Sequence, residues 1–306
     1  MTGLHDTTKP KVALVGYGEV GGIFGAALAQ SGARVTAYDI LASDAAWLAK
    51  ARERAEAAGV TLATSNAGAV NGADLVVCAV TAAQARIAGE EIARSVGKGA
   101  FVVDVNSASP QTKIACAQRI DTAGGRYVEA AVMTSVPPYG IAVPMLLGGG
   151  EAEAVLPLLA SLGFNATVGA TELGTVSAVK LCRSVVIKGM EALFIESMLA
   201  ARHYGVADEV LASLAETFPN LDWERQATWF WQRVAQHGKR RAEEMREAAV
   251  TVGDAGIEPR MASATADVQA WIASLRAAGV FESTGLKAEF RALADSVRAK
   301  TRGSSR

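Results

Sequence analysis

A glycine pattern near the start of the chain restricts the fold more than any other part of the sequence. Gly16, Gly18 and Gly21 form G-x-G-x-x-G, after the apolar run "KVALV" and before "EVGGIFGAALAQSG". This pattern predicts a buried strand, a tight turn and a helix that packs closely on the strand. The first glycine permits the turn, the second leaves room for a ligand at the backbone, and the third allows the close packing. The N-terminus of such a helix offers unpaired N–H groups to an anion.

An acidic residue further along the chain supports a dinucleotide at this turn. Asp39 lies 18 residues after Gly21, where a carboxylate accepts hydrogen bonds from an adenosine ribose. This acid repels a 2′-phosphate, and no arginine follows it directly, so the sequence predicts NAD, with NADP less favoured. A glycine turn without a nucleotide and a solvated acid are the alternatives. The predicted cofactor contacts in this part of the chain are Gly16, Tyr17, Gly18, Glu19, Val20, Gly21, Asp39 and Ile40.

The first half of the chain alternates short apolar runs with alanine-rich helical runs. The runs that predict strands are "KVALVGYG", "ARVTAYDI", "GADLVVCAV", "GAFVVDVNSAS", "GRYVEAAVM" and "VPMLLGGG". Apolar strands separated by helices are typical of a parallel sheet that is covered on both faces. From about Thr171 onward only helical patterns remain. We therefore predict an α/β, Rossmann-type doubly wound sheet over residues 1–168 and an all-α domain over residues 169–306.

The bulk composition excludes several classes of partner. The 306 residues are 50% hydrophobic and 20% charged, with a formal net charge of −1. These values predict globular domains with no general attraction to nucleic acid or to an anionic membrane. The start of the chain lacks the apolar centre of a secretory signal. Cys78, Cys116 and Cys182 lie in apolar sequence without metal-ligand spacing, so we expect buried free thiols, no metal and a cytoplasmic protein.

Ligands of a doubly wound sheet lie beyond the carboxyl ends of its strands. Two loops predicted at this edge are "VTAAQA" and "NSASPQT". From them we predict cofactor contacts at Val80, Thr81 and Asn106, and a substrate contact at Ser107. Turn formation is the alternative for Asn106 and Ser107. Ser109 fits a helix N-cap instead, because a proline follows it at the first helical position.

A long helical run in the second half combines an apolar body with a narrow polar stripe. The run is "TVSAVKLCRSVVIKGMEALFIESMLAA". At about 100° per residue, one stripe holds Ser177, Lys180, Ser184, Lys188 and Glu191, and Arg183 flanks it. Charged side chains are seldom buried without a partner, so we expect the stripe to face a polar cleft and to bind an anion. Structural ion pairs, for example between Lys188 and Glu191, are the alternative.

A cluster of aromatic residues and a charged run follow in the segment "NLDWERQATWFWQRVAQHGKRRAEEMREA". We expect its aromatic side chains to pack in the core or in a dimer interface, and one wall of a substrate pocket is the alternative. His237 is a candidate substrate contact. The run Lys239 to Glu244 predicts a solvated helix face with pairs of opposite charge four residues apart.

Together these motifs resemble the β-hydroxyacid dehydrogenase and 6-phosphogluconate dehydrogenase superfamily over nearly the whole chain. The motifs that carry the resemblance are "VGYGEVGG", "DVNSASPQT", "VMTSVPPYGIAVPMLLGGG" and "GTVSAVKLCRS". More narrowly, the chain resembles the group whose C-terminal helical domain is a phosphogluconate-dehydrogenase-like domain of unknown function. The resemblance implies a nucleotide-binding domain followed by a helical domain that forms a homodimer. Family members carry a catalytic lysine in a G-x-x-x-x-x-K pattern, which Gly174 and Lys180 match.

The activity that this resemblance implies is hydride transfer between a nicotinamide cofactor and a small hydroxy acid. Lys180 would take the hydroxyl proton during oxidation and return it during reduction. Arg183, Ser184, Lys188 and His237 would contact the substrate. The guanidinium of Arg183 suits a second carboxylate, which favours a polyhydroxy or dicarboxylic acid.

Departures from the family pattern leave the substrate open. The family usually shows Ser-Gly-Gly in its substrate loop, where this chain has Met133, Thr134 and Ser135, so Thr134 and Ser135 are expected to contact the substrate. The family usually has asparagine three or four residues after the lysine, where Arg183 and Ser184 stand. Oxidative decarboxylation of a sugar acid and a non-catalytic nucleotide-binding sensor are the alternative functions. Imine reduction is disfavoured, because that branch tends to lack the lysine.

Overall fold

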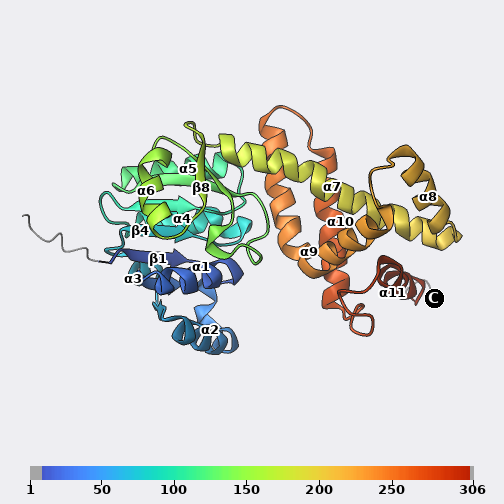
Figure 1. The fold of residues 1–306 in the computed structure, drawn as a ribbon, viewed down its shortest axis with the longest axis horizontal. Helices are drawn as coiled ribbons and strands as arrows, with labels where there is room; N and C mark the ends of the chain where they lie inside the picture. The colour runs from blue at the N-terminus through green and yellow to red at the C-terminus, as the bar shows by residue number, and fades with distance from the viewer. Residues whose placement is uncertain (1–8, 304–306) are drawn as a thin grey trace, which may run out of the picture. The chain divides into compact units, whose positions relative to one another are not determined.

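The computed structural model describes residues 9–303 (Figure 1). The chain folds as two compact units that divide between Lys180 and Leu181. The first unit contains a mixed sheet covered by helices, and the second unit is helical. The predicted fold class, a doubly wound α/β sheet followed by an all-α region, is confirmed.

Within residues 9–303, the sheet of the first unit has eight strands in the order β3-β2-β1-β4-β5-β6-β7-β8. The strands are β1 (Lys11–Val15), β2 (Arg34–Tyr38), β3 (Thr61–Leu62), β4 (Leu75–Cys78), β5 (Phe101–Asp104), β6 (Arg126–Val132), β7 (Met145–Gly148) and β8 (Ala166–Ala170). The first six strands pair in parallel. The strand order reverses at β1, which has β2 on one side and β4 on the other.

Strand β7 departs from the predicted parallel sheet. It pairs antiparallel with β6, and β8 then pairs parallel with β7. The connection from β6 to β7 contains only the short 3₁₀ turn η3 (Gly140–Ala142). A parallel neighbour is usually reached by a crossover that contains an α-helix, and this connection has none. The chain therefore turns back on itself here.

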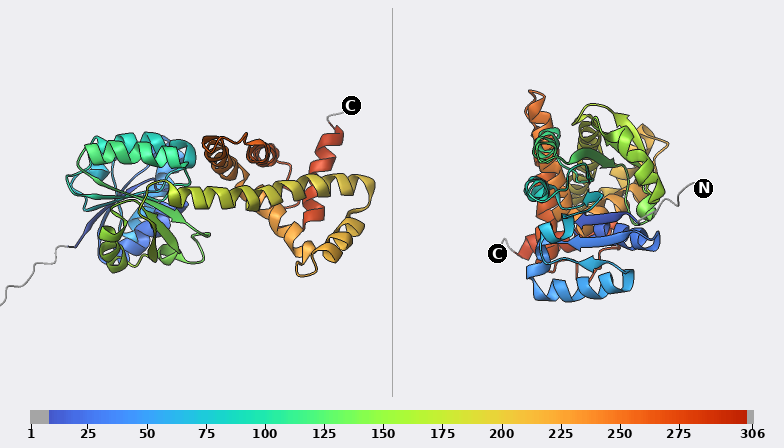
Figure 2. Two further views of the ribbon diagram at one scale, coloured as in Figure 1. Left: turned by 90° about the horizontal axis from the view of Figure 1, so that it is seen from above. Right: turned by 90° about the vertical axis from the view of Figure 1, so that its left-hand side faces the viewer.

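Helices cover both faces of the sheet (Figure 2). One face carries α1 (Glu19–Gln30), α2 (Ala45–Ala58) and α6 (Ala152–Ser161), which pack on alternate strand residues such as Leu14. The other face carries α3 (Asn66–Val70), α4 (Ala85–Ala93) and α5 (Pro110–Thr122), which pack on the intervening residues such as Val15. Two further 3₁₀ turns, η1 (Ile40–Ser43) and η2 (Ala82–Gln84), follow β2 and β4. Burial on both faces explains why the strands read as continuous apolar runs.

The predicted domain boundary after residue 168 falls inside a strand. The segment at this boundary forms β8, which pairs with β7 and closes one edge of the sheet. The first compact unit continues through the start of helix α7 (Thr175–Tyr204) to Lys180. The strand was missed because alanine and glycine, which are both depleted in strands, occupy three of the five positions of "ATVGA".

The second unit contains the remainder of α7 with α8 (Ala207–Thr217), α9 (Trp223–Asp254), α10 (Arg260–Ala277) and α11 (Phe290–Gly303). Its apolar core includes most of the predicted aromatic cluster. Trp223, Phe230 and Trp231 are buried, and Trp223 stacks on Phe194 with ring centroids 5.1 Å apart. Trp229 is 43% exposed and lies under the guanidinium of Arg233. The predicted core packing therefore holds for three of the four aromatic residues.

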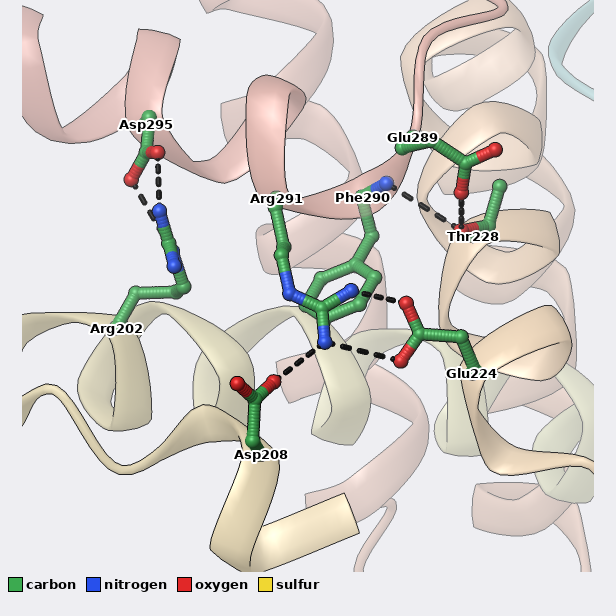
Figure 3. Close-up of polar contacts among 8 residues, drawn as sticks. All are labelled: Arg202, Asp208, Glu224, Thr228, Glu289, Phe290, Arg291 and Asp295. Atoms are coloured by element: carbon green, nitrogen blue, oxygen red, sulfur yellow. Dashed lines mark hydrogen bonds and ion pairs between the residues drawn. The ribbon is translucent and has the colours of Figure 1, made fainter.

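Ion pairs tie α11 to α7, α8 and α9 (Figure 3). The guanidinium of Arg291, on α11, binds Asp208 of α8 at 2.5 Å and also binds Glu224 of α9. Arg202, near the end of α7, binds Asp295 of α11. Because α11 follows a long irregular segment, these pairs add to its apolar packing in holding it in place. Among the described residues, no helix is both long enough and apolar enough to cross a membrane.

Candidate functional site

The three glycines of the first turn differ in the space around them. Gly16 has a φ of +96°, and a Cβ there would collide with the carbonyl of Ala79. A Cβ on Gly21 would collide with the carbonyl of Gly16. A Cβ on Gly18 would meet no atom within 4 Å. Two of the glycines are therefore required by packing, and the third leaves an open approach to the backbone.

The N-terminus of α1 lies at this open position. Gly18 is its N-cap residue, and no side chain caps the first turn. Gly18 and Glu19 are exposed, and Val20 is half-buried. Uncapped N–H groups with open space in front of them form a site that suits the pyrophosphate of a dinucleotide. The residues present therefore fit the predicted cofactor.

Asp39 lies at the carboxyl end of β2 and holds the glycine turn in place. Its Oδ2 accepts a hydrogen bond from the backbone N–H of Tyr17 at 2.7 Å, and its Oδ1 accepts one from Leu41 at 3.0 Å. Each carboxylate oxygen can accept a second hydrogen bond, so the acid remains able to bind ribose hydroxyls. Ile40 beside it is 58% exposed.

A cation that the sequence analysis missed contacts the same turn. Arg54, from α2, donates a hydrogen bond to the carbonyl of Tyr17, and its guanidinium lies 4.6 Å from the centre of the Tyr17 ring. The Tyr17 side chain is fully buried, and its hydroxyl has no hydrogen-bond partner among the described residues. Burial raises the pKa of this phenol above its ordinary value. No local pattern in the sequence places Arg54 here.

Asn106 joins the two loops that follow β4 and β5. Its Oδ1 accepts a hydrogen bond from the backbone N–H of Val80 at 2.7 Å, and its Nδ2 donates one to the Cys78 sulfur at 3.2 Å. Val80 would in turn lie 3.0 Å from a Cβ on Gly16. Thr81 is exposed, and Ser107 is half-buried beside this link. The Asn106 side chain thus holds together the two loops that are predicted to contact the cofactor. Only part of its hydrogen-bonding capacity is left for a ligand.

A buried ion pair holds the carboxyl end of β5 in place. The ammonium of Lys113, on α5, lies 2.9 Å from Oδ1 of Asp104 and donates to the Asp104 carbonyl at 2.8 Å. The hydroxyl of Tyr127 donates to Asp104 Oδ2 at 2.8 Å, and the backbone N–H of Asn106 donates to Oδ1. Burial raises the pKa of Tyr127 well above its ordinary value. The network fixes the end of β5, from which Asn106 and Ser107 follow.

Glu129, in β6, caps the N-terminus of α7 with a fully buried carboxylate. Its Oε1 accepts hydrogen bonds from the backbone N–H groups of Gly174 at 2.9 Å and Val176 at 3.2 Å. Its Oε2 accepts a hydrogen bond from the Ser177 hydroxyl at 2.7 Å. Glu129 stands opposite Asp104 in the pairing of β5 with β6. The cap therefore lies beside the carboxyl end of β5.

The start of α7 also contacts the start of α5. A Cβ on Gly174 would lie 2.9 Å from Cβ of Pro110, which follows Ser109 at the first position of α5. The Ser109 hydroxyl accepts a hydrogen bond from the backbone N–H of Thr112 at 3.3 Å, as expected of an N-cap. Lys180 lies less than two turns further along α7 and is half-buried. The first unit therefore places the lysine-bearing helix at the sheet edge that carries the glycine turn.

Further along α7, the polar stripe packs in the interior of the helical unit. Ser184, Lys188 and Glu191 are all buried. The Lys188 ammonium lies 2.9 Å from Oε2 of Glu244, on α9, and 3.0 Å from the Ser184 hydroxyl. Burial lowers the pKa of Lys188 from 10.5, and the carboxylate of Glu244 opposes that change. The structural ion pairs considered as an alternative are present, although the partner of Lys188 is Glu244 rather than Glu191.

The charged run on α9 is only partly solvated. Arg240 and Glu244 form the expected pair four residues apart. Arg241 is 2% exposed and binds Glu191, which is 0% exposed, so this part of the expected solvated face is buried. The reason is that Arg241 points toward α7, where a carboxylate compensates its charge. His237, on the same helix, is exposed.

The remaining predicted contacts lie at exposed positions. Thr134 and Ser135 are exposed on the connection between β6 and β7. Arg183 and Cys182 are exposed on α7, so the expectation of three buried thiols holds for Cys78 and Cys116 only. Cys182 is exposed because it lies on the face of α7 opposite the stripe that packs against α9.

Comparison with protein families shows which known proteins the chain is related to. Residues 11–169, more than half of its length, match the family described as the NAD binding domain of 6-phosphogluconate dehydrogenase. The chain belongs to this family. Residues 201–272 of this 6-phosphogluconate dehydrogenase-like protein match a second family, described as a domain of unknown function (DUF1932). Both matches agree with the predicted resemblance, which is thereby confirmed, and the first match shows an NAD(P)-binding domain.

Solved structures extend this similarity to nearly the whole chain. A conserved hypothetical protein from Sinorhizobium meliloti 1021 is 35% identical, with 95% of this chain and 97% of that chain covered and a TM-score of 0.72. A conserved protein of unknown function, described as structurally similar to 3-hydroxyacid dehydrogenases, is 29% identical, with 88% and 99% covered and a TM-score of 0.66. The 3-hydroxyisobutyrate dehydrogenase of Mycobacterium tuberculosis, solved with L-serine, is 18% identical, with 95% and 100% covered and a TM-score of 0.69. This member of the 6-phosphogluconate dehydrogenase-like family therefore has the fold of the 3-hydroxyacid dehydrogenases.

Proposed function

We propose that this protein is an NAD-dependent dehydrogenase of a small hydroxy acid, with Lys180 as its general acid and base. The main support for this proposal is the position of Lys180 relative to the sheet. Helix α7 begins against Pro110 at the carboxyl end of β5, and its sixth residue is Lys180. The carboxyl edge of a doubly wound sheet is where ligands bind. A lysine on a helix that starts at this edge is well situated for proton transfer to a substrate held there.

The glycine turn and Asp39 would hold the cofactor. The open backbone at Gly18 and the uncapped start of α1 suit its pyrophosphate, and the carboxylate of Asp39 suits its ribose. When bound, the nicotinamide ring supplies hydride acceptance and donation. We propose NAD rather than NADP, because the carboxylate of Asp39 would repel a 2′-phosphate and the exposed neighbour Ile40 offers no compensating charge.

Lys180 would supply the proton chemistry. During oxidation, its neutral amine accepts the proton of the substrate hydroxyl as the C–O bond gains double-bond character. During reduction, its ammonium donates that proton to the developing alkoxide. Lysine is suited to both directions, since the pKa of a lysine amine responds readily to burial and to neighbouring charge.

Arg183 is the better candidate for a carboxylate contact than Lys188. The guanidinium of Arg183 is exposed, and a guanidinium can bind a carboxylate through two parallel hydrogen bonds. Lys188 is already bound to Glu244 and Ser184 in the interior of the helical unit. Contacts from Ser107, Thr134, Ser135 and His237 stay predictions.

The test is a screen of hydroxy acids with NAD and NADP, followed at the absorbance of the reduced nicotinamide. Lys180→Met should lower kcat by about 10²- to 10⁴-fold, the usual contribution of a general acid–base group, and leave the dissociation constant of NAD unchanged. Lys239→Met, at an exposed lysine of α9, is the matched control and should retain wild-type turnover.

Three other outcomes would replace the proposal. Full turnover in Lys180→Met would remove the role of the lysine. Release of carbon dioxide with the reduced cofactor would indicate oxidative decarboxylation of a sugar acid. NAD binding without turnover of any acid in either direction would favour a nucleotide sensor.

A further inference from the structure

The cap of α7 is built from three elements of the first unit. Gly174, the residue before the helix, has a φ of +89° and no side chain, so it cannot cap the helix itself. Glu129 of β6 supplies the acceptor instead. Space for that side chain comes from Gly148 of β7, where a Cβ would lie 2.8 Å from Cγ of Glu129 and closer still to Oε1. A larger residue at Gly148 would displace the carboxylate from the helix end.

The charge of Glu129 is compensated without a basic side chain. Glu129 is 0% exposed, and none of the ion pairs between described residues includes it. Its three hydrogen-bond donors are two backbone N–H groups and one hydroxyl. The N-terminus of a helix also carries a partial positive charge that stabilises an anion. The carboxylate is therefore bound to the end of α7 by both hydrogen bonds and electrostatics.

These three hydrogen bonds restrain α7 in two ways. The N–H groups of Gly174 and Val176 fix the position of the helix end along its axis relative to β6. The Ser177 hydroxyl, on one side of the helix, fixes its rotation about that axis. Lys180 follows Ser177 by three residues, which is about 4.5 Å along the axis and nearly the same face. A restraint on both position and rotation at Ser177 is therefore passed on to Lys180.

We propose that Glu129 is the positioning residue for Lys180. It acts through the N-terminus of α7 and sets where the lysine lies relative to the carboxyl edge of the sheet. This inference rests on the proposed role of Lys180 as the proton-transfer group. It adds a residue of the sheet interior that touches neither cofactor nor substrate and whose loss should affect kcat rather than cofactor binding.

Substitution of Glu129 by alanine and by glutamine distinguishes the loss of its hydrogen bonds from the loss of its negative charge. Glu129→Ala removes all three contacts and should lower kcat by about 100-fold, the effect of a misplacement of about 1 Å at a reacting group. The KM for the hydroxy acid and the dissociation constant of NAD should change little. Glu129→Gln keeps an oxygen for the two N–H groups and offers an N–H to the Ser177 hydroxyl, so it should restore most of kcat.

A milder variant covers the case in which Glu129→Ala does not fold. Ser177→Ala removes only the contact that restrains rotation, and it should lower kcat less than Glu129→Ala while NAD binding is kept. Asp222→Ala is the matched control, because Asp222 caps α9 through the N–H of Arg225 at 3.0 Å, and its loss should leave kcat unchanged.

A second readout does not depend on turnover. After reductive methylation with ¹³C-formaldehyde, the dimethyl-lysine resonance of Lys180 is assigned by its absence in Lys180→Arg. Glu129→Ala or Ser177→Ala should shift it toward the position of an exposed lysine such as Lys239, and Glu129→Gln should not. If the protein turns over no acid but this shift occurs, the positioning role stands and the proposed function fails. A folded Glu129→Ala or Ser177→Ala protein with an unchanged resonance and wild-type kcat would overturn the inference.

Discussion

At the scale of single residues, the three glycines of the first turn divide between folding and binding. Gly16 and Gly21 have backbone carbonyls where a Cβ would be, so they are required for the turn to form at all. Gly18 faces open space, so its lack of a side chain matters only when something approaches the backbone. Within one motif, substitution of Gly16 or Gly21 should therefore disturb folding, whereas substitution of Gly18 should disturb ligand binding.

Alanine substitutions should separate the effect on stability from the effect on NAD binding. Gly21→Ala should lower the free energy of unfolding by about 1–3 kcal/mol, the usual cost of an overpacked site, because its Cβ meets the Gly16 carbonyl. Gly18→Ala should lose much less stability but should weaken NAD binding, because its methyl group occupies the phosphate approach. Urea unfolding and calorimetric titration with NAD measure the two effects. Equal loss of stability in both variants would contradict this division.

Single residues also show which contacts can be predicted from the sequence and which cannot. The glycine turn and Asp39 were predictable, since their physics is contained in a strand, a turn and a helix that follow one another. Arg54 and Glu129 were not, because their partners lie 37 and 45 residues away and nothing local indicates them. Lys113 lies only nine residues from Asp104, and a strand-end acid followed by a lysine in the next helix could have indicated that pair.

At the scale of elements, α7 and α9 are joined by buried charges. The sequence correctly predicts a long helix with a narrow polar stripe. It does not predict that the stripe packs against α9, because the contact from Glu191 to Arg241 spans 50 residues. An anion was expected for the cations of this stripe. For Lys188, the anion in the structure is the carboxylate of Glu244, supplied by the protein itself.

This arrangement predicts a pH-dependent stability. Burial holds the pKa of Lys188 below 10.5, so between the folded-state pKa and 10.5 the unfolded chain binds more protons than the folded chain. Stability due to Lys188 therefore rises with pH through this window. Glu244→Gln removes the carboxylate that raises the pKa, so the window should widen and the slope should approach about 1.4 kcal/mol per pH unit within it.

Urea unfolding at several pH values between neutrality and 10.5 measures this slope. The control is Lys188→Met in the Glu244→Gln background, which removes the titrating group and should abolish the added slope. A slope that persists in the double variant would show that another group is responsible.

At the scale of the whole molecule, the helical unit exposes large apolar side chains. Val186 is 61% exposed and Leu193, seven residues later on α7, is 57% exposed. Tyr204, the last residue of the same helix, is 77% exposed. Apolar side chains exposed along one helix are typical of a surface that another chain covers. We propose that this face of α7 is the interface of the homodimer that the family resemblance implies.

Light scattering tests that prediction. The wild-type protein should scatter with twice the mass of one chain, and Leu193→Asp should shift it toward the mass of a single chain without loss of NAD binding. Gln118→Asp, at an exposed position of α5, adds the same charge elsewhere and should not change the mass. A wild-type protein that is monomeric at all concentrations would rule out the homodimer.

The enclosed pair of Asp104 and Lys113 also restricts how this protein can change over generations. Replacing either partner alone strands an opposite charge in the interior, and such a loss costs about 3–5 kcal/mol, a large share of the stability of a typical domain. Exchanging both together leaves no unpaired charge in the interior. Any lineage that loses this pair should therefore have lost both members at nearly the same time, and chains with only one of them should be scarce.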